Sequence, residues 1–253
     1  MKISAPKEQL LNAVLLAERI TGKKESLPIL SCVLLEAADK HLTIRATNLE
    51  AGIEIITPAS IEGGGVIAVS APILSQTLRS ISGDTTTLKD IEGNLSVESR
   101  GSKNLIKAIP HKEFPTLAQE KKQKGFSISR ERLLKGLQAV VYAASPSMIR
   151  PELGSVYISI EAGSITTVAT DSFRLAEKKM VGATKKESGE FLIPLKHCSE
   201  LIYILERIPG DEVEIATDEA QITISGDGVR FISRAVYAPF PNYKEIIPRS
   251  STT

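Results

Sequence analysis

The chain has no tryptophan and few aromatic residues of any kind. Phe and Tyr together make up only 4% of its 253 residues, whereas hydrophobic residues as a whole make up 42%. We therefore expect cores built from Ile, Leu, Val and Ala. The hydrophobic share is ordinary for a globular protein, and the length suits one large domain or two domains of common size.

The sequence also lacks membrane and secretion signals. No apolar run approaches the roughly 20 residues that a membrane-spanning helix needs. The N-terminal segment, MKISAPKEQLL, lacks the apolar stretch of a secretory signal. The two cysteines, Cys32 and Cys198, lie far apart in different halves. Two buried, reduced thiols fit this pattern better than a disulfide scaffold, so we expect a cytoplasmic protein without membrane association.

Charge gives no indication of a partner either, because the net charge is only +1. A balanced total is compatible with a basic stripe that is offset by an acidic face elsewhere. The distribution of charge therefore matters more than its sum.

The motifs of common enzyme classes are absent from the sequence. It has no Gly-x-Ser-x-Gly elbow, no P-loop and no Gly-x-Gly-x-x-Gly after a predicted strand, and residues 62–65 (Glu-Gly-Gly-Gly) favour a turn between strands. The histidines, His41, His111 and His197, do not have the spacing of metal ligands. His197 and Cys198 are neighbours on a predicted helix, where adjacent side chains diverge, so they cannot form a nucleophile–base pair. We expect no catalytic residue, no metal and no cofactor.

What the chain does contain is an internal repeat. An apolar stripe at helical spacing occurs near the N-terminus and again 123 residues later, in the same order. The members of the two stripes are Leu10, Leu11, Val14 and Ala17, and Leu133, Leu134, Leu137 and Val140. Each stripe follows a short alternating segment that predicts a strand.

The correspondence continues along both halves. Residues 42–48 and 165–171 are alternating segments that end on Ala-Thr and then Asn or Asp, a residue that suits a turn. Residues 69–81 and 193–205 each predict a strand end followed by an amphipathic helix, and hairpins follow both. Phe-Pro pairs at 114–115 and 240–241 lie near the ends of the two copies.

These parallels predict two domains of one α+β fold, in which an antiparallel sheet carries two helices on one face. We place the first domain at residues 1–118 and the second at residues 126–253. The charged segment 119–125 reads as the linker between them. Each copy has the size of an ordinary domain.

Three strings within this repeat carry a resemblance to a known family. They are Leu-Pro-Ile-Leu at 27–30, Val-Ala-Thr-Asp-Ser-Phe-Arg-Leu-Ala at 168–176, and Phe-Pro-Asn-Tyr-Lys-Glu-Ile-Ile-Pro at 240–248. In this order and spacing the sequence resembles the β subunit of bacterial DNA polymerase III, the sliding clamp, from Met1 to Pro248. The resemblance implies a non-catalytic processivity subunit that encircles duplex DNA and tethers polymerase and clamp-loader subunits.

Members of this family carry three such domains per chain, and two chains join head to tail into a ring with helices lining the hole. This sequence ends at Thr253, where a third copy is expected to begin. We therefore expect a truncated or fragmentary clamp rather than a natural two-domain variant, with head-to-tail association impaired.

Two groups of site residues follow from the resemblance and from clamp physics. A ring that slides should contact phosphates without reading bases, and basic residues on or beside the predicted helices suit that task. The DNA-binding candidates are Lys23, Lys24, Arg79, Lys135 and Lys196, together with Lys103 as a weaker candidate on the last predicted hairpin of the first domain. The alternative is that these residues are ordinary solvated surface.

The second group matches the family's pocket for short linear motifs. Its members are Leu153, Thr170, Ser172, Phe173, Arg174, Leu175, Pro241 and Ile246. Apolar members would receive hydrophobic anchors, and Arg174 would hold a polar or acidic group. Ser172 and Phe173 stand where relatives often carry Gly and His. The alternative for Leu153 and Leu175 is a purely structural place in the core.

Two other functions stay open at this point. One is a scaffold whose repeated domains bind peptides without DNA, and the other is an enzyme with an unrecognised site. Salt-dependent DNA affinity separates a clamp from a peptide scaffold, because only phosphate contacts release counterions.

Overall fold

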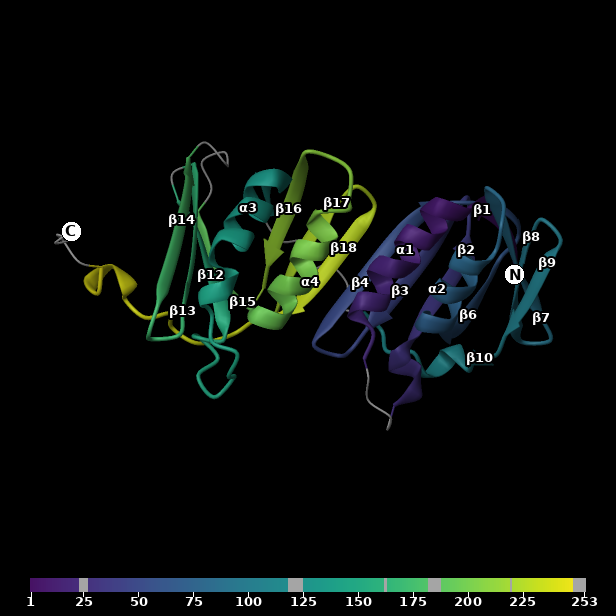
Figure 1. Cartoon of the computed structure of the whole chain (residues 1–253), viewed down its shortest axis with the longest axis horizontal. Helices are drawn as coiled ribbons and strands as arrows, with labels where there is room; N and C mark the ends of the chain where they lie inside the picture. Colours follow the sequence, from purple (N-terminus) through teal and green to yellow (C-terminus); the bar gives the residue numbers. More distant parts are fainter. Residues whose placement is uncertain (23–26, 118–124, 162, 182–187, 219, 248–253) are drawn as a thin grey trace. The chain divides into compact units, whose positions relative to one another are not determined.

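The computed structural model describes residues 1–22, 27–117, 125–161, 163–181, 188–218 and 220–247. It divides into two compact units (Figure 1). The first unit comprises residues 1–122 with 225–232, and the second comprises residues 123–224 with 233–253. Lys23, Lys24 and nearly all of the predicted linker 119–125 lie outside the described residues.

The first unit contains two helices, α1 (Lys7–Ile20) and α2 (Ala71–Ser80), within its described residues. Its strands are β1 (Lys2–Pro6), β2 (Cys32–Ala38), β3 (His41–Thr47), β4 (Ala51–Pro58), β5 (Ser60–Gly63), β6 (Gly65–Ser70), β7 (Thr85–Ile91), β8 (Asn94–Ser99), β9 (Ser102–Ile106) and β10 (Ala108–Ile109). Short 3₁₀ segments lie at Pro28–Ser31 and His111–Glu113.

The second unit repeats this order with helices α3 (Arg130–Val140) and α4 (Leu195–Leu205). Its strands are β11 (Phe126–Ser129), β12 (Ser155–Glu161), β13 (Ser164–Thr170), β14 (Leu175–Val181), β15 (Gly189–Pro194), β16 (Glu212–Thr217) and β17 (Gln221–Gly226). The strand β18 (Val229–Arg234) is divided between the two units, and the last two residues of β17 also belong to the first unit. Further 3₁₀ segments lie at Val141–Ala143 and Tyr243–Glu245.

The central strands follow the same order in both units, and the first unit has the additional edge strands β5 and β10. Neighbouring strands run β6-β2-β3-β4 in the first and β15-β12-β13-β14 in the second. The other ladder runs β1-β7-β8-β9 in the first, and its counterpart β11-β16-β17 follows in the second. The pairs β2–β3 and β12–β13 are both antiparallel, and each strand lies 123 residues from its counterpart. The predicted fold class, repeated α+β units of antiparallel sheet, is therefore confirmed.

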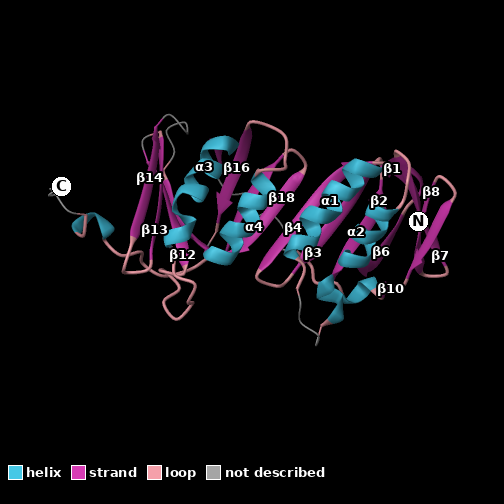
Figure 2. Cartoon of the chain, viewed as in Figure 1, coloured by secondary structure: helices cyan, strands magenta, loops and turns pink. Residues whose placement is uncertain are grey.

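Each helix pair buries an apolar stripe against the sheet. In α1, Leu10, Val14 and Ala17 have no exposed surface, and in α3 the same is true of Leu133 and Leu137. Within its own unit, α1 packs beside α2 and against β3 and β4, and α3 packs beside α4 and against β13 and β14 (Figure 2). Burial of one large apolar side chain stabilises the fold by about 1.5–3 kcal/mol, so these stripes fix which face of each helix points outward.

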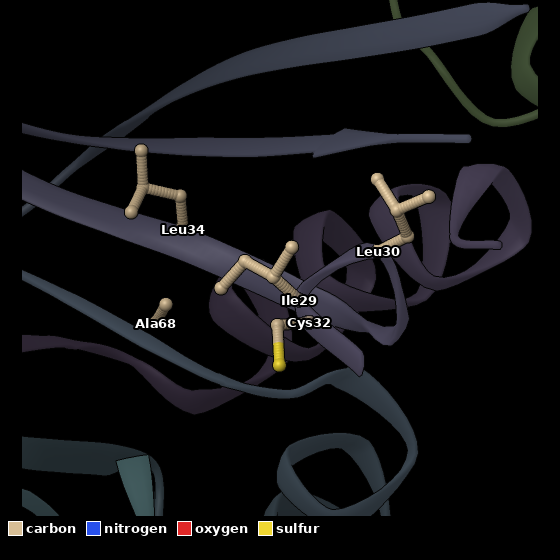
Figure 3. Packing of buried hydrophobic residues seen from close by; sticks show 5 residues of the cluster. All are labelled: Ile29, Leu30, Cys32, Leu34 and Ala68. Atoms are coloured by element: carbon tan, nitrogen blue, oxygen red, sulfur yellow. The ribbon is translucent and has the colours of Figure 1, made fainter. Parts of the chain in front are cut away.

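The Leu-Pro-Ile-Leu string has a structural role in the first unit. It forms a 3₁₀ turn before β2, with Pro28 at its first position. Figure 3 shows that Ile29 and Leu30 belong to a buried cluster with Cys32, Leu34 and Ala68. Three half-buried side chains close this cluster: Val66, Ile109 and Phe114. The Phe-Pro pair of the first copy therefore seals a small core.

The glycine-rich string at 62–65 differs from the predicted turn. Glu62 and Gly63 belong to β5, and Gly65 begins β6, so that only Gly64 stands between the strands. A Cβ on Gly64 would lie 3.0 Å from the carbonyl oxygen of Ala37. Close backbone approach, rather than a long loop, explains the glycine at this position.

The structure contains, within its described part, no helix long and apolar enough to cross a membrane.

Two glycines with positive φ, Gly83 before β7 and Gly93 in the β7–β8 hairpin, give a test of the first unit. Gly83 has φ +104°, and a Cβ there would lie 2.8 Å from Oγ of Ser99, whose single hydroxyl proton is shared between the carbonyls of Ser82 and Thr85. Gly93 has φ +77° with open space around it. Gly93→Ala should cost about 1–2 kcal/mol, from backbone strain alone. Gly83→Ala should cost about 1–3 kcal/mol more, because a buried hydroxyl loses its partners. Urea unfolding at constant m-value measures both, and equal losses would contradict this account.

Candidate functional site

Four predicted DNA-binding residues lie on described elements, where their side chains are exposed. Arg79 is in the last turn of α2, and Lys135 and Lys196 are on α3 and α4. Lys103 is on β9 rather than on a helix. The two predicted lysines that follow α1 lie outside the described residues.

The four exposed cations differ in their neighbours. Lys135 pairs with Glu131 one turn earlier on α3, and Lys103 lies 3.5 Å from a carboxylate oxygen of Glu98. Within the described residues, Arg79 and Lys196 have no ion-pair partner. Exposed ion pairs contribute little free energy, so Lys135 and Lys103 can exchange their partners for phosphates.

The predicted peptide-binding residues centre on the turn between β13 and β14. Thr170 is buried, and its hydroxyl donates to the carbonyl of Arg174 (2.7 Å) and accepts from the N–H of Ser172 (3.2 Å). One carboxylate oxygen of Asp171 accepts from the N–H groups of Phe173 and Arg174, both at 3.0 Å. These backbone hydrogen bonds hold the pKa of Asp171 below its ordinary value. Thr170 thus positions the turn and does not line a surface.

The turn presents Phe173 and Arg174 outward. The Phe173 side chain is 97% exposed, which is unusual for a phenyl ring, and Ser172 holds the positive φ of +77° that aims it there. The Arg174 guanidinium lies 3.0 Å from the second carboxylate oxygen of Asp171 and 5.8 Å from the centre of the Tyr142 ring. The guanidinium of Arg174 therefore lies over the aromatic ring of Tyr142.

Leu153 is placed near this group by the loop after α3, but it is only 5% exposed. Its carbonyl accepts from the N–H of Ser145, three residues beyond Tyr142. Leu175 is half-buried at the start of β14. The structural alternative therefore holds for most of the Leu153 side chain, and Leu175 offers more surface.

Pro241 and Ile246 come from a separate segment that Tyr243 anchors. Ile246 is 64% exposed, and its N–H donates to the carbonyl of Tyr243. Tyr243 is buried, and the carboxylate of Glu177 acts on its hydroxyl from β14, the strand that begins at Leu175. Burial first, and then this carboxylate, raise the pKa of Tyr243 well above its ordinary value.

Tyr243, which the sequence prediction did not include, anchors the segment that carries two of the predicted residues. The Phe-Pro-Asn-Tyr string at 240–243 contains this tyrosine and carries part of the family resemblance, but the string alone does not indicate that Tyr243 is an anchor. Phe240 links Tyr243 to the sheet, because its ring lies edge-on to Tyr243 at 6.2 Å and stacks on Tyr157 at 4.9 Å. The Phe240–Tyr157 contact joins residues that are far apart in the sequence, so a short sequence motif cannot reveal it.

No catalytic arrangement appears around the thiols. Cys198 is fully buried and donates to the carbonyl of Ile193 (3.4 Å), whereas Nδ1 of the adjacent His197 lies 2.7 Å from Oγ of Ser233. The two side chains diverge, as predicted. Burial raises the pKa of Cys198 far above its ordinary value, which suppresses the reactive thiolate. Among the described residues, no group of three His, Cys, Asp or Glu side chains is arranged to hold a metal ion.

The chain has two units of one antiparallel fold, and each unit has a pair of helices with basic side chains on the exposed face. This combination is the architecture of the DNA-clamp class. Family models agree with this class. The model described as DNA polymerase III beta subunit, N-terminal domain, matches residues 1–118, and the central-domain model matches residues 127–242. The chain belongs to the family of DNA polymerase III β subunits, the β sliding clamps.

Relatives and solved structures give the same result. The chain is 26% identical over 257 residues to the beta sliding clamp of Synechococcus elongatus, and 27% identical over 256 residues to that of Pseudomonas aeruginosa. Each comparison covers 98% of this chain and 68% of the relative. The DNA polymerase III beta subunit of Thermotoga maritima superposes with a TM-score of 0.91 at 24% identity, covering 98% of this chain and 68% of the other.

A further structure, a sliding clamp from P. aeruginosa bound to griselimycin, superposes with a TM-score of 0.91 at 25% identity, covering 99% of this chain and 68% of that one. A role as a DNA polymerase processivity clamp is thereby supported at the level of the family.

The buried thiols provide a test of the site's inertness. Cys32 and Cys198 are both buried, and burial is the main cause that raises each pKa. Neither thiol should react with a disulfide reagent in the native protein at pH 8, and both should react at once in urea. Time-resolved thiol titration measures this. Rapid modification of Cys198 without urea would show that the second unit opens around α4.

Proposed function

We propose that the chain acts as a sliding clamp that encircles duplex DNA and tethers polymerase and clamp-loader subunits through the second unit. The observation that carries the DNA part is the arrangement of the helix pairs. Each pair buries its apolar stripe, so that Arg79, Lys135 and Lys196 remain on exposed helix surface. Fixed cations on rigid helices suit contact with a phosphate backbone.

Sliding requires contacts that carry no sequence information. Phosphate oxygens repeat along the duplex, and cations that contact only phosphates hold the protein on DNA with equal strength at each position. Arg79 and Lys196 are the strongest candidates, because within the described residues neither forms an ion pair of the kind that Lys135 and Lys103 form. Lys103 is a weaker candidate, since Glu98 interacts with it on the strand β8.

The DNA proposal predicts a change in salt dependence. Arg79→Ala and Lys196→Ala should each weaken binding to any duplex sequence, and each should reduce the slope of log K against log salt by about 1. Fluorescence anisotropy with two unrelated duplexes across a salt series measures this. Lys107→Ala and Lys179→Ala are the matched controls, because they remove exposed cations from outside the helices. If all four variants behave alike, Arg79 and Lys196 are only solvated surface.

For peptide binding, the supporting observation is the outward turn with its neighbours. Phe173 and Ile246 offer apolar surface, and Arg174 offers a guanidinium that already bonds one carboxylate. A motif with a hydrophobic anchor and an acidic group near it fits this chemistry. The rival function, a peptide scaffold that does not bind DNA, would keep this surface but give no salt slope with duplexes.

The first unit contains a built-in control for the peptide surface. Thr47 donates to the carbonyl of Ala51 (2.8 Å) and accepts from the N–H of Leu49 (3.0 Å), as Thr170 does in the second unit. Leu49 and Ser172 share the same φ of +77°. The two turns therefore have the same backbone conformation and the same threonine hydrogen bonds, but only the turn of the second unit belongs to the proposed peptide surface.

Thr170→Val and Thr47→Val should both destabilise the protein, by about 1–3 kcal/mol each, because buried backbone groups lose a partner. Only Thr170→Val should weaken binding of a synthetic peptide that carries the clamp-binding motif of a polymerase III α subunit. Loss of about 1 kcal/mol of preorganisation corresponds to about fivefold. Urea unfolding and titration calorimetry measure the two effects. Equal loss of peptide affinity in both variants would contradict the assignment to the second unit.

A further inference from the structure

The second unit contains a groove that none of the predicted site residues lines. It has a volume of about 470 Å³, within the range of ligand pockets. One wall is formed by residues 190–192 of β15 together with Tyr157 of β12, and the opposite wall by residues 235–240. Thr217, Asp218 and Ile222 complete the lining.

The first unit shows what normally occupies this position. Strands β6 and β15 are counterparts, because each pairs with β2 or β12 in matching antiparallel register. The outer side of β6 is covered by β10, with Ala108 opposite Val69 and Ile109 opposite Ala68. The sheet order ends at β15 in the second unit, so that no described strand covers the outer side of β15.

The cluster shown in Figure 3 is the closed counterpart of the groove. Leu34, Val66, Ala68 and Phe114 of the first unit correspond in order to Tyr157, Glu190, Leu192 and Phe240 of the second. The first four residues pack with Ile109 of β10 into a small core. All four counterparts line the open groove instead. Residues 235–236, which follow β18 as β10 follows β9, line the groove but do not form a strand on β15.

Residues 235–240 do not fill that place. The N–H of Ala235 donates to the carbonyl of Ala220 (2.9 Å), and the Tyr237 hydroxyl donates to the carbonyl of Asp218 (3.3 Å). These hydrogen bonds attach the segment to the turn between β16 and β17. Phe240 is held by its stacking on Tyr157, whose hydroxyl donates to Glu190 (2.6 Å). Hydrogen bonds and ring stacking thus hold the residues that line the groove, and the groove itself is open.

The charge of the lining selects the occupant. The described lining contains two carboxylates, those of Glu190 and Asp218, and no Lys or Arg. At the position of Glu190 the closed counterpart has the apolar Val66. Exposed strand edges are normally covered, and an extended peptide covers one by backbone pairing.

We infer that β15 is a docking edge for an extended partner segment, which adds antiparallel to β15 as β10 adds to β6. The segment has an apolar residue, which fills the place of Ile109 against Leu192, and a neighbouring Lys or Arg that faces Glu190. This groove is distinct from the surface around Phe173 and Arg174, and it does not depend on the function proposed for that surface.

The first unit supplies a probe of known fit. A capped synthetic peptide that copies residues 103–113 contains the β10 strand with three lysines and one glutamate. Titrated into the ¹⁵N-labelled 253-residue chain, it should shift the amides of β15 and of residues 235–240, and it should slow hydrogen exchange in β15. No shift up to a peptide concentration of about 1 mM overturns the proposal.

Two controls separate strand addition from other binding. N-methylation of alternate peptide amides should abolish binding for one of the two sets of positions and spare the other, because alternate N–H groups of a strand point to opposite sides. Equal behaviour of the two sets overturns the proposal. Glu190→Lys should weaken binding about three- to tenfold, whereas Glu214→Lys, an equal charge change on the exposed side of β16, should not.

The remaining occupant is a second copy of the chain. In that case the β15 amides would be protected without peptide, and protection would increase with protein concentration. That result overturns the assignment of a separate partner segment.

Discussion

The fold depends on one packing constraint, the burial of a helix pair against one face of an antiparallel sheet. Leu10, Val14 and Ala17 of α1, and Leu74 and Leu78 of α2, have no exposed surface. At about 1.5–3 kcal/mol for each large side chain, these contacts outweigh the modest energies of surface ion pairs. They therefore decide which helix face stays outside, and the polar residues on that face become available for the proposed contacts with DNA. The positions of the exposed charges are therefore determined by the packing of the apolar stripes.

A second constraint acts at the turns that follow β3 and β13. A threonine hydroxyl and an Asn or Asp side chain bind the turn backbone in both units, so the conformation does not depend on the outward residues. This separation leaves the outward positions free to differ, and they carry Glu50 in the first unit and Phe173 in the second. A rigid turn whose outer side chain is exchangeable suits a recognition surface, because rigidity lowers the entropy lost on binding.

Much of this architecture could be predicted from the sequence. The stripes at Leu10 and Leu133, the Ala-Thr turns and the Phe-Pro pairs repeat at a nearly constant separation, and local periodicity is what sequence patterns report well. The prediction was less complete for the peptide-binding surface. Leu153 is nearly buried, and Thr170 uses its hydroxyl on the backbone, so neither offers much surface. Tyr243 was missed as an anchor because its role arises from contacts with Phe240 and Glu177, which lie on other elements.

The repeat also turns the chain into its own reference structure. Where both copies keep the same residue type, as at Thr47 and Thr170, the shared geometry explains the choice without any ligand. Where an apolar contact in one copy becomes a carboxylate or a phenol in the other, folding alone gives no reason for the change. Leu34 and Val66 bury apolar surface in a closed cluster, whereas Tyr157 and Glu190 hydrogen-bond each other beside an open groove. A polar pair in place of an apolar contact gives up burial energy, and a sheet edge without cover leaves backbone groups unpaired. The lost apolar burial at Tyr157 and Glu190 and the uncovered edge of β15 lie at the same groove. A strand bound to β15 would bury apolar surface there and pair with the backbone of the edge.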